Sequence, residues 1–266
     1  MTSFGSKPLA VVTGASSGIG RELAKQFAKN DFDLIVNAED DRLDAAAAEL
    51  RAYGAHVRAV RADLRTAEGV EKVYTAITET GRPLEVAALN AGVGQGGAFL
   101  DTDLTDEIDI IDLNITSTVR LAKRILRDMA VRDEGKVLIT SSIASTMPGS
   151  FQAVYNASKS FLQSFGEALQ NELKDTGITI TVLMPGPTET DFFRRAGMRD
   201  TKVGASSKDD PAQVAAQGFR ALMKGDAKVV AGSLGTKVQG VANKVLPDRL
   251  KAAAHRKMAE PGSARR

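Results

Sequence analysis

Short apolar runs alternate along the chain with longer segments in which apolar residues recur every three to four positions. The runs predict buried strands, and the longer segments predict amphipathic helices that cover them. We expect strands at LAVVT (9–13), DLIVN (33–37), HVRAV (56–60), LEVAALN (84–90), GKVLITS (135–141) and GITITVLMP (177–185). This alternation is typical of repeated strand–helix–strand units, so we predict an α/β fold with a doubly wound parallel sheet.

The C-terminal part of the chain differs from the rest in charge. Between Lys224 and Arg266, ten Lys and Arg residues accompany only three Asp and Glu residues. We therefore divide the 266 residues into one main domain, residues 1–230, and a basic extension, residues 231–266, which we predict to be helical.

The composition excludes several classes of function. Cysteine is absent and only two histidines occur, so thiol catalysis, disulfides and the usual zinc sites are excluded, and we predict no metal site. A formal net charge of +2 does not indicate a nucleic acid partner. We see no signal-like apolar region at the start and no apolar run long enough to span a membrane, so we expect a cytoplasmic protein.

Three glycines follow the first predicted strand in TGASSGIGRELAKQFA, namely Gly14, Gly18 and Gly20. Glycines between a strand and a helix permit a tight turn that brings a phosphate close to the helix N-terminus. An ordinary tight turn is the alternative. The position of these glycines favours phosphate binding and a Rossmann-like sheet.

The spacing of these glycines, together with Thr13, resembles that of the short-chain dehydrogenase/reductase family. Further motifs match in order: LNAG (89–92) with Leu89 in place of a first Asn, Asp63 in RADL, and PGPTET (185–190). The resemblance covers about residues 9–190 and implies binding of a nicotinamide dinucleotide, NAD(H) or NADP(H). The residues it implies for this role are Gly14, Ser16, Ser17, Gly18, Ile19, Gly20, Asn37, Asp63, Leu64, Asn90, Ala91, Gly92, Tyr155, Lys159, Pro185, Gly186, Thr188 and Thr190.

The segment VYNASKSF places Tyr155 and Lys159 four residues apart on one face of a predicted helix. A cation at this spacing would lower the pKa of the phenol, which is about 10 in water, and let it act as a general acid and base. The family resemblance adds Ser142, thirteen residues before Tyr155, to orient the substrate oxygen, and Asn114 to hold a water. It also implies that Lys159 binds the nicotinamide ribose, Asp63 the adenine and Thr190 the carboxamide. A helix-capping Asp63 and a surface Asn114 remain alternatives.

These residues predict an oxidoreductase that transfers a hydride between a nicotinamide cofactor and a carbonyl or secondary alcohol. The alternative is a catalytically silent dinucleotide-binding protein that regulates a partner. The loops after the strands are apolar, which favours an uncharged hydrophobic small-molecule substrate. Their large apolar residues are Phe99, Met147, Phe151, Phe192, Phe193 and Met198; the two adjacent phenylalanines could instead anchor a local core.

The end of the second predicted strand bears on the choice of cofactor. In the family, an acid there selects NAD and an Arg selects NADP. This chain has Asn37 and Ala38, and Ser17 occupies the other usual basic position. The nearest charge is Glu39, so the sequence slightly favours NAD(H), with Arg42 as the residue that could reach a phosphate.

Two expectations concern partners. The helix that carries Tyr155 is apolar around much of its circumference, which, with the family resemblance, favours a homo-oligomer, a dimer or tetramer. The tail has an apolar stripe of Leu250, Ala254 and Met258 beside basic residues. That pattern fits either a helix lying on a membrane surface or a solvated terminal helix.

Overall fold

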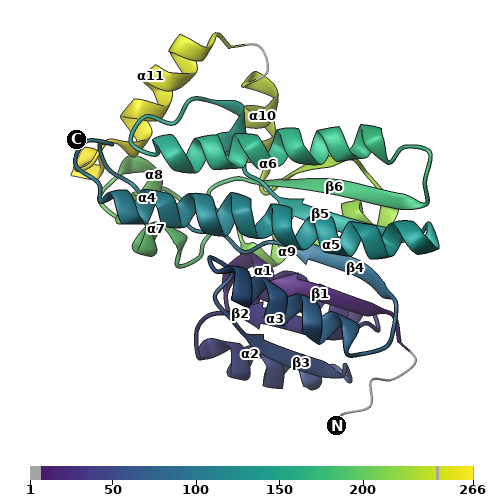
Figure 1. Cartoon of the computed structure of the whole chain (residues 1–266). Helices are drawn as coiled ribbons and strands as arrows, with labels where there is room; N and C mark the ends of the chain where they lie inside the picture. The colour runs from purple at the N-terminus through teal and green to yellow at the C-terminus, as the bar shows by residue number, and fades with distance from the viewer. Residues whose placement is uncertain (1–6, 244–245, 266) are drawn as a thin grey trace.

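The apolar runs of the sequence form one parallel sheet in the computed structural model, which describes residues 7–243 and 246–265 (Figure 1). The strands lie in the order β3-β2-β1-β4-β5-β6-β7, and the order reverses between β1 and β4, which confirms the predicted doubly wound fold. Their bounds are β1 (Leu9–Thr13), β2 (Asp33–Ala38), β3 (Val57–Arg61), β4 (Leu84–Leu89), β5 (Gly135–Thr140), β6 (Ile178–Pro185) and β7 (Lys228–Ala231).

Helices connect successive strands and cover both faces of the sheet (Figure 1). Those of the main domain are α1 (Gly18–Lys29), α2 (Arg42–Arg51), α3 (Ala67–Thr78), α4 (Leu104–Ile110), the π-helical turn η1 (Ile111–Thr116), α5 (Ser117–Arg132), the 3-10 helix η2 (Ile143–Thr146), α6 (Ala153–Glu172), α7 (Phe192–Arg195), α8 (Lys202–Ala205) and α9 (Pro211–Lys224). Those of the tail are α10 (Leu234–Ala242), α11 (Asp248–Ala259) and the 3-10 helix η3 (Ser263–Arg265).

Alternate residues of the strands point to two separate cores. On one face, α1, α2 and α9 pack on the sheet through residues such as Phe27 and Leu222. On the other face, α3, α5 and α6 contribute residues such as Ile125 and Leu162. Because both faces are covered, most positions of the central strands are buried and apolar, as the continuous runs predict.

The seventh strand was not among the six strands expected from the sequence. β7 has only four residues, and it pairs with β6 at the edge of the sheet. An edge strand is covered less completely than a central one, so its sequence, KVVA, carries a weaker apolar signal.

The tail turns back toward the segment between β5 and α6. In Figure 1, α10 and α11 lie beside the N-terminal end of α6. Asn243 donates a hydrogen bond to Thr146 of η2 (2.9 Å), and a ring nitrogen of His255 lies 2.9 Å from the carbonyl oxygen of Ser150. In the part of the chain that the structure describes, none of the helices is long and apolar enough to cross a membrane.

Candidate active site

One cavity of about 380 Å³ lies at the carboxyl ends of the strands and extends from the glycine turn after β1 to α11. The predicted residues that line it are Gly14, Ser16, Ser17, Gly18, Ile19, Gly20, Asn37, Asp63, Leu64, Asn90, Ala91, Gly92, Ser142, Tyr155, Lys159, Pro185, Gly186, Thr188 and Thr190. Asn114 lies behind this lining. The fold therefore brings together residues from seven separate segments of the sequence.

The glycine turn has the close backbone packing that a phosphate site requires. Gly14 and Gly18 have φ values of +67° and +56°, which L side chains rarely adopt. A Cβ atom on Gly20 would lie 2.1 Å from the carbonyl oxygen of Gly14. Ser17 is the N-cap of α1, and its side chain makes no capping hydrogen bond, so the first N–H groups of this helix remain available to an anion. These residues fit the pyrophosphate of a dinucleotide.

The end of β2 differs from the sequence expectation. Asn37 is followed by one more strand residue, Ala38, so Glu39 is the first residue beyond the strand. The amide nitrogen of Asn37 donates hydrogen bonds to the carbonyl oxygens of Val60 and Ala62, both at 3.0 Å. Its donors are therefore used in joining β2 to β3, because a buried amide must be paired.

Asp63 lines the cavity after β3, but it does not cap α3, whose N-cap is Thr66. Arg65 donates to both carboxylate oxygens of Asp63 at 3.0 Å. Burial opposes ionisation here, but the hydrogen bonds from Arg65 outweigh it and lower the pKa of Asp63. An adenine amino group would have to share this carboxylate with Arg65.

Asn90 ties three neighbouring strands together at the floor of the cavity. Its amide nitrogen donates to the carbonyl oxygen of Thr13 at 3.2 Å, and its amide oxygen accepts from the hydroxyl of Thr140 at 3.1 Å. The backbone N–H groups of Asn90 and Ala91 both donate to the Thr13 hydroxyl, at 2.9 and 3.0 Å. Thr13 and Asn90 therefore fix the ends of β1, β4 and β5 relative to one another.

Asn114 occupies the π-helical turn η1 and is fully buried, so the surface alternative is wrong. Its amide group exchanges hydrogen bonds with the backbone of Val93 (2.9 and 3.0 Å) and donates to Ser158 at 2.9 Å. A Cβ atom on Gly92 would lie 3.1 Å from the Asn114 oxygen and 3.2 Å from the Lys159 nitrogen. The amide of Asn114 and the ammonium of Lys159 thus approach each other around Gly92.

Ser142, Tyr155 and Lys159 meet at one end of the cavity. Ser142 is the N-cap of η2, accepts from the N–H of Ala144 at 3.1 Å, and hydrogen-bonds with the Tyr155 hydroxyl. The Lys159 nitrogen lies 5.9 Å from the centroid of the Tyr155 ring. Both side chains project from α6, as the four-residue spacing predicts.

The pKa of Tyr155 shifts in the direction opposite to the one expected from the sequence. Burial raises it to about 12, although the hydrogen bond with Ser142 opposes this rise. Burial also lowers the pKa of Lys159 to about 8. The physical reason is the loss of hydration on burial, which disfavours the charged form of both groups. The attraction between the two charges across several ångströms is too weak to offset this loss.

Aromatic side chains and the tail enclose the end of the cavity near Tyr155. The rings of Phe192 and Tyr155 are 5.0 Å apart, centroid to centroid. Phe193 packs in a small separate core with Met198 and Ala259, so one of the two adjacent phenylalanines faces Tyr155 and the other anchors the tail. Phe99 is mostly exposed. The cavity residues from the tail, which the sequence did not indicate, are Gln239, Asn243, Leu246, Lys251, Ala254, His255 and Met258.

Comparison with known proteins agrees with this geometry. Oxidoreductase UcpA of Salmonella typhimurium is 31% identical over 216 residues, which are 80% of this chain and 79% of that protein. The 3-oxoacyl-(acyl-carrier-protein) reductase FabG of Escherichia coli is 30% identical over 186 residues, 70% of this chain and 75% of that protein. A short-chain dehydrogenase from Sphingobium yanoikuyae in complex with NADPH has a TM-score of 0.76 and 27% identity, over 90% of this chain and 96% of that chain.

Residues 8–200 match the short chain dehydrogenase family, and this span contains the glycine turn, Ser142, Tyr155 and Lys159. The match covers well over half of the chain, and it agrees with the fold, with the cavity and with the relatives that bind a nicotinamide dinucleotide. The chain belongs to the short-chain dehydrogenase/reductase family.

Proposed function

We propose that this protein interconverts a carbonyl compound and a secondary alcohol with a nicotinamide dinucleotide, and that Tyr155 is its general acid and base. The observation that carries the proposal is the meeting of Ser142, Tyr155 and Lys159 at one end of a cavity whose other end is the glycine turn. A phenol in the same cavity as a glycine turn that fits a phosphate supports this class of reaction.

When bound, the cofactor supplies or accepts the hydride. In the direction of reduction, the Tyr155 hydroxyl gives its proton to the carbonyl oxygen as the hydride reaches the carbonyl carbon, and oxidation reverses both transfers. Ser142 hydrogen-bonds with the phenol, so it can orient the same oxygen. Lys159 donates to the carbonyl oxygen of Thr140 at 3.0 Å, which keeps its ammonium beside the phenol and on the cofactor side of the cavity.

The pKa of Tyr155 bears on the protonation state from which each direction of the reaction begins. With a pKa near 12, the phenol is protonated throughout the neutral range and is ready to donate. A base for alcohol oxidation would need the phenolate, which burial disfavours. The cation at Lys159, with a pKa near 8, assists either direction only while it keeps its proton.

The lining near Tyr155 supports an uncharged, mostly hydrophobic substrate. Phe192, Met147, Leu246 and Met258 contribute apolar surface to this end of the cavity. Lys251 also lines it, but its ammonium already donates to the carbonyl oxygen of Thr146 (3.0 Å) and pairs with Asp248 (2.7 Å). This use of its donors argues against Lys251 as an anchor for an anionic substrate.

A panel of ketones and secondary alcohols tests the proposal against the silent regulatory alternative. We expect oxidation of NADH or NADPH, followed by absorbance at the nicotinamide band, with hydrophobic ketones and not with small keto acids. Binding of either cofactor without turnover of any carbonyl or alcohol in the panel would favour the regulatory alternative. Preference for charged keto acids would contradict the substrate class.

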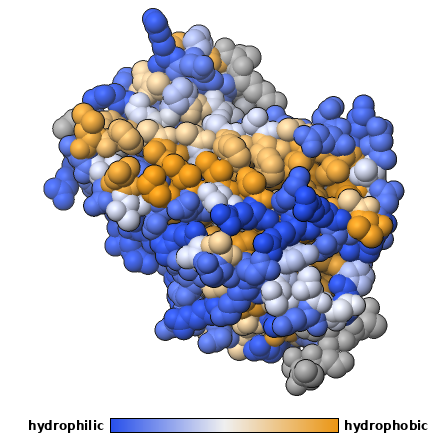
Figure 2. Space-filling view, in the orientation of Figure 1, coloured by the Kyte–Doolittle hydropathy of each residue, from blue (hydrophilic) through white to orange (hydrophobic). Residues whose placement is uncertain are grey.

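We also propose a homo-oligomer that forms through α4 and α6. Leu104 and Ile108 on α4, Ile111 at the start of η1 and Phe161 on α6 are exposed apolar residues, and α4 and η1 both contact α6. Figure 2 shows an apolar band across the face where α5 and α6 lie in Figure 1. Light scattering at micromolar concentration should give a dimer or tetramer, and the Leu104→Asp variant should shift the mass toward the monomer.

The exposed apolar residues of the tail form a second surface, which is separate from the one proposed for the oligomer. Leu234, Val238, Leu250 and Met258 are exposed on α10 and α11, next to basic residues. The apolar stripe of Leu250, Ala254 and Met258 suggests that this surface binds peripherally to anionic lipid. Ala254 and Met258 also line the cavity. Co-sedimentation with anionic liposomes, with and without residues 246–266, would decide it.

A further inference from the structure

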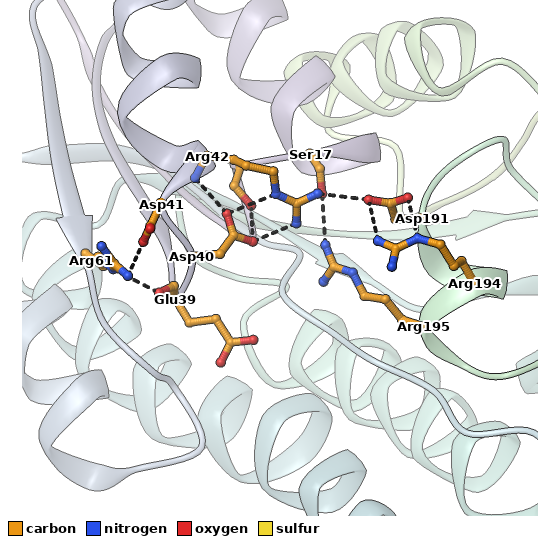
Figure 3. Close-up of polar contacts among 10 residues, drawn as sticks. Ser17, Glu39, Asp40, Asp41, Arg42, Arg61, Asp191, Arg194 and Arg195 are labelled. Carbon is orange, nitrogen blue, oxygen red and sulfur yellow. Dashed lines mark hydrogen bonds and ion pairs between the residues drawn. The ribbon is translucent and has the colours of Figure 1, made fainter.

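An arginine joins the two walls of the cavity at the end where β2 finishes (Figure 3). Arg42 is the first residue of α2, and its Nη1 atom donates to Asp191 at 2.8 Å. Asp191 immediately precedes α7, 149 residues further along the chain, while the rest of the guanidinium binds Asp40. Asp40 and Asp191 both line the cavity, so Arg42 bridges its two rims.

Arg42 also occupies the acceptor positions of Asp40. One carboxylate oxygen accepts from the backbone N–H of Arg42 (3.1 Å) and from its Nε (3.2 Å). The other accepts from Nη2 of Arg42 (2.7 Å) and from the hydroxyl of Ser16 (3.1 Å). A carboxylate has about four acceptor positions. Asp40 therefore has none left for a ribose hydroxyl, although it lies about twenty residues beyond the glycine turn, where an acid commonly binds the 2′-hydroxyl.

The neighbouring acids are neutralised in the same way. Glu39 pairs with Arg65 at 2.8 Å, and Asp41 pairs with Arg61. In Figure 3 the Glu39 carboxylate points away from Ser17 and Arg42. The acidic sequence EDD (39–41) consequently presents little uncompensated negative charge to this end of the cavity.

Arg195 adds a cation to the same place. Its Nη2 atom lies 3.4 Å from the hydroxyl of Ser17, from which it is separated by 178 residues in sequence. Arg195 lines the cavity, and it has no carboxylate within 4.0 Å among residues 7–243 and 246–265. Its neighbour Arg194 is instead bound to Asp191, at 3.1 Å. The three arginines Arg42, Arg194 and Arg195 thus exceed the two acids Asp40 and Asp191 by one positive charge.

We propose that Arg195 and Arg42 form a subsite for the 2′-phosphate of NADP(H), so that the protein prefers the phosphorylated cofactor. A guanidinium binds phosphate oxygens through parallel hydrogen bonds, and an arginine near the adenosine ribose accommodates a 2′-phosphate. Arg42 can turn from Asp191 to the phosphate because Asp191 keeps Arg194 as its partner. The sequence favoured NAD(H) because no cation stands beside Asn37 or at position 17; the fold brings one to Ser17 from α7.

This subsite rests on the proposed function only in requiring that the cavity binds a nicotinamide dinucleotide. Equilibrium titration with NADPH and NADH, followed by nicotinamide fluorescence, measures the preference without turnover. Competition by 2′,5′-ADP and by 5′-ADP tests the phosphate alone, because neither compound carries a nicotinamide. Loss of catalysis in Tyr155→Phe would leave both readouts intact, so failure of the mechanism and failure of this subsite are distinguishable.

We expect the wild-type protein to bind NADPH at least about tenfold more tightly than NADH, and 2′,5′-ADP more tightly than 5′-ADP. Arg195→Ala should weaken NADPH binding by about tenfold and leave NADH binding within about twofold. Arg199→Ala is the control, since Arg199 is another exposed arginine of the same segment that is not part of the cavity lining, and its removal should preserve the preference.

Arg42→Ala should change the two affinities in opposite directions. It removes a phosphate ligand, which weakens NADPH binding, and it frees Asp40 to accept the ribose hydroxyl, which strengthens NADH binding. Arg42 and Arg195 are solvent-exposed, so their replacement should not unfold the protein. Equal affinity of the wild type for NADPH and NADH would overturn the proposal. Equal weakening of both by Arg195→Ala would also overturn it, because Arg195 would then bind the shared pyrophosphate.

Discussion

The ammonium nitrogen of Lys159 lies 5.9 Å from the ring centroid of Tyr155 and donates to the carbonyl oxygen of Thr140 at 3.0 Å. The cation is therefore held by the end of β5 and not by the phenol. Because both groups are buried, the pKa of Tyr155 rises to about 12 and that of Lys159 falls to about 8. Tyr155 is thus poised as a proton donor, and Lys159 is the group of the pair that titrates closest to neutrality.

The first prediction concerns the pH dependence of carbonyl reduction. Lys159 is charged below its pKa of about 8, so kcat/KM should be level near pH 7 and fall as the pH rises above 8. Steady-state rates from pH 6.5 to 9.5 with one ketone measure this. His255→Gln is the control. Burial lowers the pKa of His255 below its usual 6.5, so the titration of this group cannot cause a decline in kcat/KM above pH 8. The decline should therefore persist in His255→Gln.

The second prediction separates function from stability at Lys159. The folded-state pKa lies below the value in the unfolded chain, so the protonated lysine opposes folding at pH 7, and this cost disappears as the pH rises toward 10.5. Lys159→Met should abolish turnover and raise the free energy of unfolding by about 2 kcal/mol at pH 7. Urea denaturation of the wild type and of Lys159→Met at pH 7 and pH 10 measures the free energy of unfolding at each pH. A variant that is less stable than the wild type at pH 7 would show that the hydrogen bond to Thr140 outweighs the burial cost.

The third prediction concerns the glycine turn. A methyl group on Gly20 would lie 2.1 Å from the backbone oxygen of Gly14, and neither atom belongs to a flexible side chain. Gly20→Ala should therefore distort the turn, weaken dinucleotide binding by at least about tenfold and destabilise the fold by about 1–3 kcal/mol. Gly235→Ala, in α10, is the control, because the nearest atom to its added methyl group is the Ser233 hydroxyl oxygen at 3.7 Å. Unchanged cofactor affinity in Gly20→Ala would contradict the assigned phosphate site.

The fourth prediction tests the tail as a wall of the substrate end. Ala254 lines the cavity from α11, whereas Ala253 on the same helix does not. Ala254→Trp should raise KM for bulky ketones several-fold and leave the Kd of the cofactor unchanged, because it narrows only the end near Tyr155. Ala253→Trp should change neither value. If the two variants behave alike, the tail does not shape the substrate site.

Much of this architecture could be predicted from local sequence signals. The glycine turn, the strand ends and the pair Tyr155 and Lys159 depend on spacings of a few residues, which helix and strand geometry convert directly into positions in space. The family resemblance added Ser142, which the structure places beside Tyr155. The six predicted strands are all present, because the central ones are buried and mostly apolar, and the edge strand β3 still packs Val57, Ala59 and Val60 against the cores.

The remaining features depend on contacts between distant segments. The approach of Arg195 to Ser17 and the bridge from Arg42 to Asp191 follow from the path of the loop after β6, which no local pattern encodes. The tail reads as an amphipathic surface helix because its cavity-lining residues are of mixed polarity and spread from α10 to α11, so they form no single apolar stripe in the sequence. The pKa of Tyr155 was predicted with the wrong sign, since the sequence gives the spacing of the charges but not the loss of hydration on burial.

The central claim is that the Tyr155 hydroxyl supplies the proton. Tyr155→Phe removes only that oxygen and keeps the ring that packs against Phe192. The measurement is turnover of a ketone that the wild type reduces, with cofactor affinity titrated in the same preparation. The account predicts a fall in kcat of at least about a hundredfold with the Kd of the cofactor within about threefold of wild type. Wild-type turnover by Tyr155→Phe would contradict the account.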